Sequence, residues 1–159
     1  MIDDNKKTER RKLLAAGGTA ALLAMVAKGR EAAAAELSES EAANVKLVTA
    51  FCVAWSSRQL ANVTALMSDD AVYRMSQTTP PVTGHAGLIG QMQPWVDTSD
   101  TIEFKILETM AKGPIVINHR IDHFASKTRP VTWEGVGVFY VENGKIKEWS
   151  DYTIRVERA

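Results

Sequence analysis

The fold is decided by residues 130–156, which read PVTWEGVGVFYVENGKIKEWSDYTIRV. Apolar and polar residues alternate on both sides of the ENG sequence at 142–144, and an Asn-Gly pair between two alternating runs is a strong signal for a β-hairpin. Alternating runs also occupy residues 101–112 and 114–127. The C-terminal half of the chain is therefore predicted to form a meander of four long antiparallel strands.

The residues before this meander are predicted to be mainly helical. Apolar side chains recur at helical spacing in residues 39–56, and shorter runs predict helices at 60–67 and 85–95. A short strand is predicted at 71–75, and the segment 78–84 must be a loop because it contains two consecutive prolines. Helices that precede an antiparallel meander are typical of an α+β fold with the helices on one face of the sheet.

Residues 1–35 have the layout of an export signal. The basic sequence KKTERRK at 6–12 precedes an apolar run at 13–27 and four alanines at 32–35, which is the order of regions in a secretory signal peptide. Arg10-Arg11 resembles the twin-arginine export motif. We therefore expect a signal peptide at 1–35, a single domain at 36–159, and a periplasmic or secreted protein. An uncleaved N-terminal anchor helix is the alternative.

The composition indicates which kinds of partner this domain is expected to bind. The whole chain is 45% apolar and 24% charged with a formal net charge of zero, so nothing indicates nucleic-acid binding or, after signal cleavage, membrane binding. Cys52 is the only cysteine and lies in an apolar run, which favours a buried structural thiol. No set of histidine and acidic residues has the spacing of metal ligands, so no metal is predicted.

Three strands place charged and aromatic side chains on faces that could meet. By alternation, the residues that share a face are Asn118, Arg120, Asp122 and Phe124 on one strand, Trp133, Gly135, Gly137 and Phe139 on the next, and Trp149, Asp151 and Thr153 on the last. Glycines inside a strand often mark a bend or a close approach, so the sheet could form a cup. Alternation leaves open whether Arg120 and Asp122 face the cup or solvent. The aromatic neighbours favour the cup, where an arginine between two carboxylates would pair the buried charges.

The order of these motifs resembles the limonene epoxide hydrolase family. The chain has NHRID at 118–122, GVF at 137–139, NGKI at 143–146 and WSDY at 149–152, which match the family's Arg-x-Asp, Gly-Val-Phe, Gly-Lys-Ile turn and Trp-x-Asp-Tyr motifs. The resemblance extends over roughly residues 42–155. It implies the cone-shaped nuclear transport factor 2-like fold, shared with SnoaL-like polyketide cyclases and ketosteroid isomerases. That fold is a half-barrel of curved mixed or antiparallel sheet, with three N-terminal helices over its concave face.

The resemblance also implies a reaction that needs neither metal nor cofactor. Asp122 would be the general acid that protonates the epoxide oxygen, Asp151 the general base that takes a proton from water, and Arg120 the bridge between them. The family holds the water with a Tyr-x-Asn pair as well. Tyr73 matches the tyrosine, but Met75 stands where the asparagine belongs and lacks the hydrogen-bonding groups of an amide. An insertion could bring Ser76 into that place.

The substrate is expected to be small and either apolar or aromatic. The residues predicted to contact it are Met75, Met92, Trp95, Phe124, Trp133, Phe139 and Trp149. Three functions stay open: an epoxide hydrolase, a lyase, isomerase or cyclase that uses the same acid–base pair without water, and a non-catalytic ligand-binding domain.

Further expectations concern the outer face of the sheet. The resemblance implies a homodimer through this face, and the apolar residues Ile117, Ile121 and Val138 allow it. His119 and His123 fall on the same face by alternation, and His85 is predicted to be a surface residue at the start of the third helix. These three histidines are therefore predicted to lie away from the reaction.

Overall fold

The computed structural model describes residues 36–128 and 130–156, so the predicted signal peptide lies outside the described residues. The helices are α2 (Glu39–Ala54), the 3-10 turn η1 (Trp55–Ser57), α3 (Leu60–Thr64) and α4 (Gly84–Thr98). The strands are β1 (Met67–Arg74), β2 (Val82–Thr83), β3 (Thr101–Lys112), β4 (Ile115–Ala125), β5 (Val131–Glu142) and β6 (Lys145–Arg155). None of the described helices is long and apolar enough to span a membrane.

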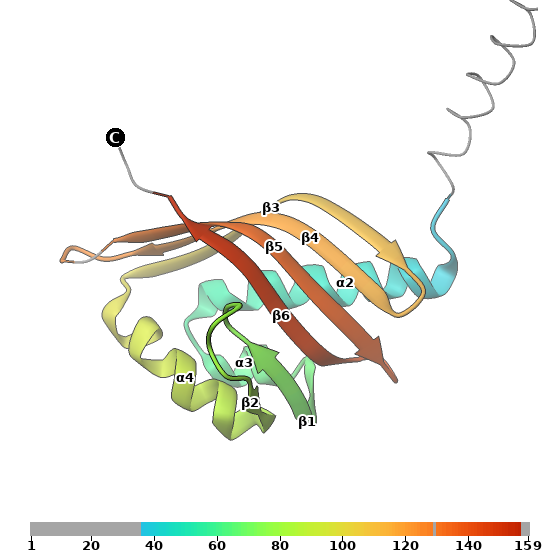
Figure 1. Cartoon of the computed structure of the whole chain (residues 1–159), viewed down its shortest axis with the longest axis horizontal. Coiled ribbons are helices and arrows are strands. Elements are labelled where there is room, and N and C mark those ends of the chain that lie inside the picture. The colour runs from blue at the N-terminus through green and yellow to red at the C-terminus, as the bar shows by residue number, and fades with distance from the viewer. Residues whose placement is uncertain (1–35, 129, 157–159) are drawn as a thin grey trace, which may run out of the picture. The chain divides into compact units, whose positions relative to one another are not determined.

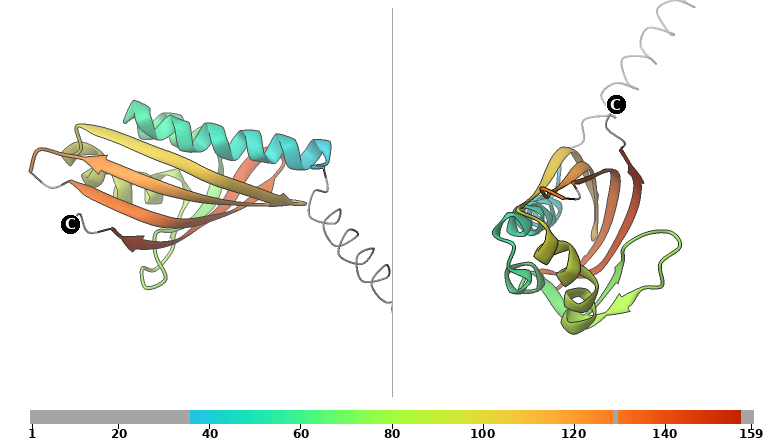
Figure 2. Two further views of the ribbon diagram at one scale, coloured as in Figure 1. Left: turned by 90° about the horizontal axis from the view of Figure 1, so that it is seen from above. Right: turned by 90° about the vertical axis from the view of Figure 1, so that its left-hand side faces the viewer.

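The strands form one curved sheet in the order β2-β1-β6-β5-β4-β3. Strands β3 to β6 pair antiparallel as the meander predicted, whereas β1 pairs parallel to β6, so the sheet is mixed. Figures 1 and 2 show the long strands curving over the three α-helices, which lie against the concave face without closing the sheet into a barrel. The predicted α+β half-barrel with helices on its concave face is confirmed.

Helix α2 is held at its first turn by a capping box. The Ser38 hydroxyl accepts a hydrogen bond from the Glu41 backbone N–H at 3.3 Å, and the Glu41 carboxylate accepts one from the Ser38 N–H at 2.9 Å. The other Glu41 oxygen accepts from the Gly113 N–H at 2.8 Å, in the turn between β3 and β4. The start of the helix is therefore tied to the end of the sheet's edge hairpin.

The predicted helix at 60–67 is wrong in its second half. Helix α3 ends at Thr64, and Met67 already belongs to β1, where it pairs with Ile146 of β6. The Leu66 carbonyl accepts a hydrogen bond from the Ile146 N–H at 3.0 Å. Strand pairing with a segment far away in the sequence therefore overrides the apolar spacing that looked helical.

An aromatic cluster fills the space between the helices and the middle of the sheet. The Trp149 ring stacks on Tyr73 with centroids 4.0 Å apart and on Phe139 with centroids 6.0 Å apart. Trp55 stacks on Phe104 at 4.9 Å. All five of these side chains are buried, and they come from η1 and from four strands of the sheet, β1, β3, β5 and β6. The packed core therefore extends as far as Trp149, which also lines a cavity.

Candidate active site

A cavity of about 350 Å³ opens between β6, the concave face and α4, within the size range of small-molecule sites. Its lining residues are Tyr73, Met75, Ser76, Met92, Trp95, Phe104, Asp122, Phe124, Trp133, Trp149, Asp151, Thr153 and Arg155. Most of this wall is aromatic or thioether surface. The two aspartates are its buried charged members, each only 5% exposed.

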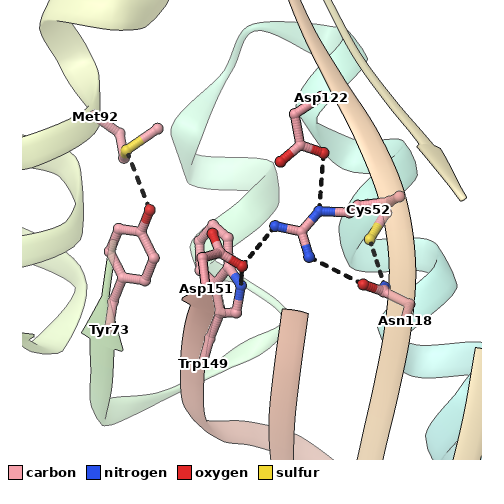
Figure 3. Close-up of polar contacts among 8 residues, drawn as sticks. Cys52, Tyr73, Met92, Asn118, Asp122, Trp149 and Asp151 are labelled. Atoms are coloured by element: carbon pink, nitrogen blue, oxygen red, sulfur yellow. Dashed lines mark hydrogen bonds and ion pairs between the residues drawn. The ribbon is translucent and has the colours of Figure 1, made fainter. Parts of the chain in front are cut away.

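Arg120 joins these two aspartates. Its Nε donates to Asp122 Oδ1 at 2.8 Å, and its Nη2 donates to Asp151 Oδ1 at 2.6 Å (Figure 3). The Arg120 side chain is 1% exposed, which excludes the alternative in which these charges face solvent. Two carboxylates around one guanidinium satisfy the requirement that buried charges be paired.

The third nitrogen of the guanidinium is bound by Asn118. Arg120 Nη1 donates to Asn118 Oδ1 at 2.9 Å, and Asn118 Nδ2 donates to the Cys52 sulfur at 3.4 Å (Figure 3). The predicted burial of Cys52 is confirmed. Sequence reasoning placed Asn118 on the correct face but assigned it no function. A polar residue between apolar neighbours on a buried strand face was the available signal.

Gly137 is required by the position of the guanidinium. A Cβ atom at Gly137 would lie 1.9 Å from Arg120 Nη1, closer than any side chain tolerates. A Cβ at Gly135 would lie 2.3 Å from the Tyr152 carbonyl oxygen. The prediction that these strand glycines mark close approaches is confirmed, with Arg120 as one of the approaching groups.

The two carboxylates differ in their hydrogen bonds. Asp151 Oδ1 accepts a second hydrogen bond, from Trp149 Nε1 at 2.7 Å, whereas Arg120 is the one donor to Asp122 among the residues that the structure describes. Burial raises the pKa of Asp122 to about 6 against the lowering effect of Arg120, and the charge of Asp151 adds to the rise. Burial also raises the pKa of Asp151, while hydrogen bonds from Arg120 and Trp149 lower it. The anion is therefore better stabilised on Asp151.

Each carboxylate keeps one oxygen available to a ligand. Among the described residues, the second oxygen of Asp122 and that of Asp151 have no hydrogen-bond partner, and both aspartates line the cavity. In Figure 3 these oxygens point away from the guanidinium. A small molecule in the cavity can therefore reach both carboxylates at once.

Tyr73 also reaches the cavity. Its hydroxyl donates to the Met92 sulfur at 3.7 Å, and its ring is 2% exposed beneath the α4 side of the wall. Burial and the charge of Asp151 raise the pKa of Tyr73 well above its ordinary value, so the hydroxyl stays protonated. Because its hydrogen is directed to the thioether, the oxygen remains free to accept a hydrogen bond.

Both residues considered for the water-binding position lie in the wall. The Met75 sulfur accepts a hydrogen bond from Gln91 Nε2 at 3.6 Å. The Ser76 hydroxyl is hydrogen-bonded to Thr79 Oγ1 at 2.7 Å, within its own loop. A thioether therefore stands where the expected motif has an amide.

The other predicted contact residues divide into two groups. Trp95, Phe124 and Trp133 line the cavity beside Met75, Met92 and Trp149. Phe139 does not, which corrects its prediction as a substrate contact, because it is fully buried behind the Trp149 ring. Phe104, Thr153 and Arg155 line the cavity without having been predicted as substrate contacts. Alternation had already placed Thr153 on the same face as Trp149 and Asp151, and one further step would have added Arg155.

The histidines lie away from the cavity. His119 Nε2 is 3.1 Å from Glu134 Oε1, and His123 Nδ1 is 3.1 Å from Thr132 Oγ1, on the outer face. His85 is half-buried at the start of α4. Across residues 36–128 and 130–156, no three histidine, cysteine or acidic side chains are grouped so that they could hold a metal ion.

Comparisons with known proteins show which proteins this chain is similar to. The sequence profile of the SnoaL-like domain matches residues 48–149. A comparison with curated proteins found no match. An LEH-like epoxide hydrolase from M. tuberculosis is 28% identical with a TM-score of 0.61, over 72% of this chain and 84% of that one.

More distant structures share the fold. A Jannaschia sp. CCS1 protein described as a SnoaL-like polyketide cyclase is 14% identical with a TM-score of 0.66, over 76% of this chain and 91% of that one. A Catenulispora acidiphila protein with a ketosteroid isomerase-like fold, solved with trimethylamine, is 18% identical with a TM-score of 0.60, over 67% and 83%. At these identities the likeness concerns the fold alone.

Proposed function

The chain belongs to the SnoaL-like domain family, and within this family we propose that it is a cofactor-independent epoxide hydrolase acting on a small apolar epoxide. One observation carries the proposal. Two buried carboxylates converge on a single guanidinium, and each has an oxygen at an apolar cavity that no group in the described part of the chain binds. The 28% identity to an LEH-like epoxide hydrolase supports the same reaction.

In the proposed reaction Asp122 is the acid and Asp151 is the base. Asp122 donates its proton to the epoxide oxygen while Asp151 takes a proton from water, whose oxygen attacks a ring carbon as the C–O bond breaks. The product is a vicinal diol, and the proton gained by Asp151 replaces the one lost by Asp122. The assignment follows from the hydrogen bonds, because Asp151 accepts two at one oxygen and is the more stable anion.

Tyr73 is proposed to orient the attacking water. Its hydroxyl hydrogen is directed to the Met92 sulfur, so its oxygen can accept a hydrogen bond from a water that Asp151 also holds. Two acceptors on one water would aim a lone pair of its oxygen at the epoxide carbon.

The second candidate function is a lyase, isomerase or cyclase that uses the same two carboxylates without water. The observation that favours it is Met75, whose thioether lines the cavity where an amide would help hold water. Such a reaction needs only proton transfer between Asp122, the substrate and Asp151.

Turnover of an epoxide panel in oxygen-18 water distinguishes these candidates. Hydrolysis predicts one labelled oxygen in the diol, and Asp122→Asn or Asp151→Asn should lower kcat by about 10²-fold or more. Asp100→Asn is the matched control, because Asp100 is exposed and outside the cavity wall. Unlabelled products would overturn hydrolysis in favour of the second candidate, and full activity in both cavity variants would show that the carboxylates are not catalytic.

We also propose that the domain works after export. The support is the sequence of residues 1–35, with its arginine pair, apolar run and alanines. Replacing Arg10 and Arg11 by lysine should retain the protein in the cytoplasm, as measured by fractionation. Mass spectrometry of the exported wild type should find a new N-terminus near Glu36, and an intact N-terminus would instead indicate the anchor helix.

A further inference from the structure

The mouth of the cavity has a polar character that the proposed reaction does not use. Strand β6 places Trp149, Asp151, Thr153 and Arg155 on the concave face in alternation. Exposure increases along this row, since Trp149 is 1% and Asp151 5% exposed, Thr153 is half-buried and Arg155 is exposed. The row therefore runs from the core to solvent, with the Cα atoms of Asp151 and Arg155 about 13 Å apart at the rise of an extended strand.

Arg155 brings a cation to the cavity wall. Within the described part of the chain its guanidinium forms no ion pair and no side-chain hydrogen bond. The other guanidinium nearby, that of Arg120, already pairs its charge with Asp122 and Asp151, donates to Asn118 as well, and is not part of the cavity wall. A negative group that enters the cavity can therefore pair with Arg155 but not with Arg120.

The surface next to Arg155 is aromatic. Its backbone is in register with Trp133 on β5, and Trp133 lines the cavity together with Phe124 and Trp95. The Trp95 and Phe124 rings lie 5.8 Å apart, so the wall between the mouth and Asp122 is suited to a flat apolar body. One cation above an apolar wall selects a molecule with one negative end.

We propose that the substrate is an aromatic or similarly apolar molecule with a single carboxylate, which Arg155 binds at the mouth while the reacting carbon lies at Asp122 and Asp151. The placement of the reacting carbon at Asp122 and Asp151 rests on the proposed function. A carboxylate fits better than a phosphate, because one guanidinium donates two parallel hydrogen bonds to a carboxylate and balances one charge. When Asp122 is protonated and Asp151 is ionised, as the proposed reaction requires, the charges of Arg120 and Asp151 cancel and the inner site does not repel the anion.

Binding without chemistry tests this proposal directly. Trans-cinnamate and cinnamamide have the same shape and differ in charge, and quenching of the cavity tryptophans reports their binding. Wild type should bind cinnamate about tenfold more tightly than cinnamamide. Arg155→Gln should remove this preference and Arg155→Lys should keep part of it. Lys105→Gln, an exposed charge outside the cavity wall, is the control and should keep the full preference.

Turnover then separates the two proposals. With 3-phenylglycidate and its amide as substrates, Arg155→Gln should raise the KM for the carboxylate about tenfold relative to the KM for the amide. Cinnamate preference without hydrolysis of either epoxide supports the carboxylate site and overturns the hydrolase. Hydrolysis without any preference for the anion overturns the carboxylate site and leaves the hydrolase standing. Equal binding of cinnamate and cinnamamide by wild type overturns the proposal.

Discussion

At the scale of single residues, the position of one proton determines how the site can work. Asp122 accepts one hydrogen bond and has a pKa raised to about 6 by burial, whereas Asp151 Oδ1 accepts two hydrogen bonds. The reaction needs Asp122 protonated and Asp151 ionised. We therefore predict that kcat/KM falls as the pH rises above about 6, because the acid loses its proton. A pH profile that is flat from 5 to 8 would contradict this assignment.

The pH dependence of stability gives a second test of the protonation of Asp122. Because the pKa of Asp122 is higher in the folded protein than its ordinary value, the folded state binds more protons than the unfolded state between about pH 4 and 6. The free energy of unfolding of wild type should therefore fall, relative to that of Asp122→Asn, as the pH rises through this window. Urea titrations at several pH values would measure the difference in unfolding free energy between the two proteins. A difference that stays constant with pH would contradict the burial of Asp122.

Gly137 shows how closely the backbone and Arg120 approach. A Cβ 1.9 Å from Nη1 would push the guanidinium away from Asn118, so Gly137→Ala should lose about 1–3 kcal/mol of stability and about 10²-fold in activity. Thermal unfolding and initial rates would measure both losses. Gly90→Ala is the control, since a Cβ there meets nothing within 4 Å and alanine favours the helix. Equal behaviour of the two variants would contradict the close approach.

At the scale of secondary-structure elements, Glu41 connects α2 to the β3–β4 turn. Hydrogen bonds from the N–H groups of Gly113 and Ser38 lower the pKa of Glu41 to about 2. A depressed pKa means that the ionised carboxylate stabilises the fold above about pH 4.5 and that this stabilisation is lost as the pH falls towards 2. The Tm of Glu41→Gln should therefore lie below that of wild type at neutral pH, with a gap that narrows in acid.

Glu39→Gln is the matched control for this prediction. Glu39 lies in the same first turn of α2, is exposed, and makes no side-chain hydrogen bond within the described residues. Its Tm should follow that of wild type across the pH range. If the Tm of both variants falls by the same amount at neutral pH, the loss arises from the charge at the helix end and not from the contact with Gly113.

Most elements follow from local pattern, and the exceptions have a common cause. Strands β3 to β6 begin and end within about two residues of their predicted bounds, because alternation and turn residues are local signals. The end of α3 was misjudged because Met67 pairs with Ile146, which is distant in the sequence. Helix α4 continues to Thr98 past Pro94, where Thr98 donates to the Pro94 carbonyl at 2.8 Å.

At the scale of the whole domain, the convex face of the sheet is suited to contact with a second copy. Val136 and Tyr152 are in register on this face, and Tyr152 and Ile154 are 50% and 70% exposed. Burying such apolar area between two copies is favourable, so we predict a homodimer through this face. Sedimentation should give twice the chain mass for wild type, and Tyr152→Lys should give monomers.

The control for dimerisation is an apolar residue on another surface. Val53 is 64% exposed on α2, away from the sheet's convex face, so Val53→Lys should leave the dimer intact. A monomeric wild type would contradict the prediction, as would a Tyr152→Lys variant that remains dimeric.

The sequence by itself determined which residues share a strand face, because a strand alternates its side chains regardless of its partners. It placed Arg120 with Asp122, and Asp151 with Trp149, correctly. Only the tertiary structure decided that this shared face is the concave one, because that depends on where the helices pack. The tertiary structure also decided how deeply each side chain on this face is buried, since Phe139 lies behind Trp149 whereas Arg155 reaches the mouth of the cavity. Burial depends on contacts between segments that are far apart in the sequence, so alternation within one strand does not determine it.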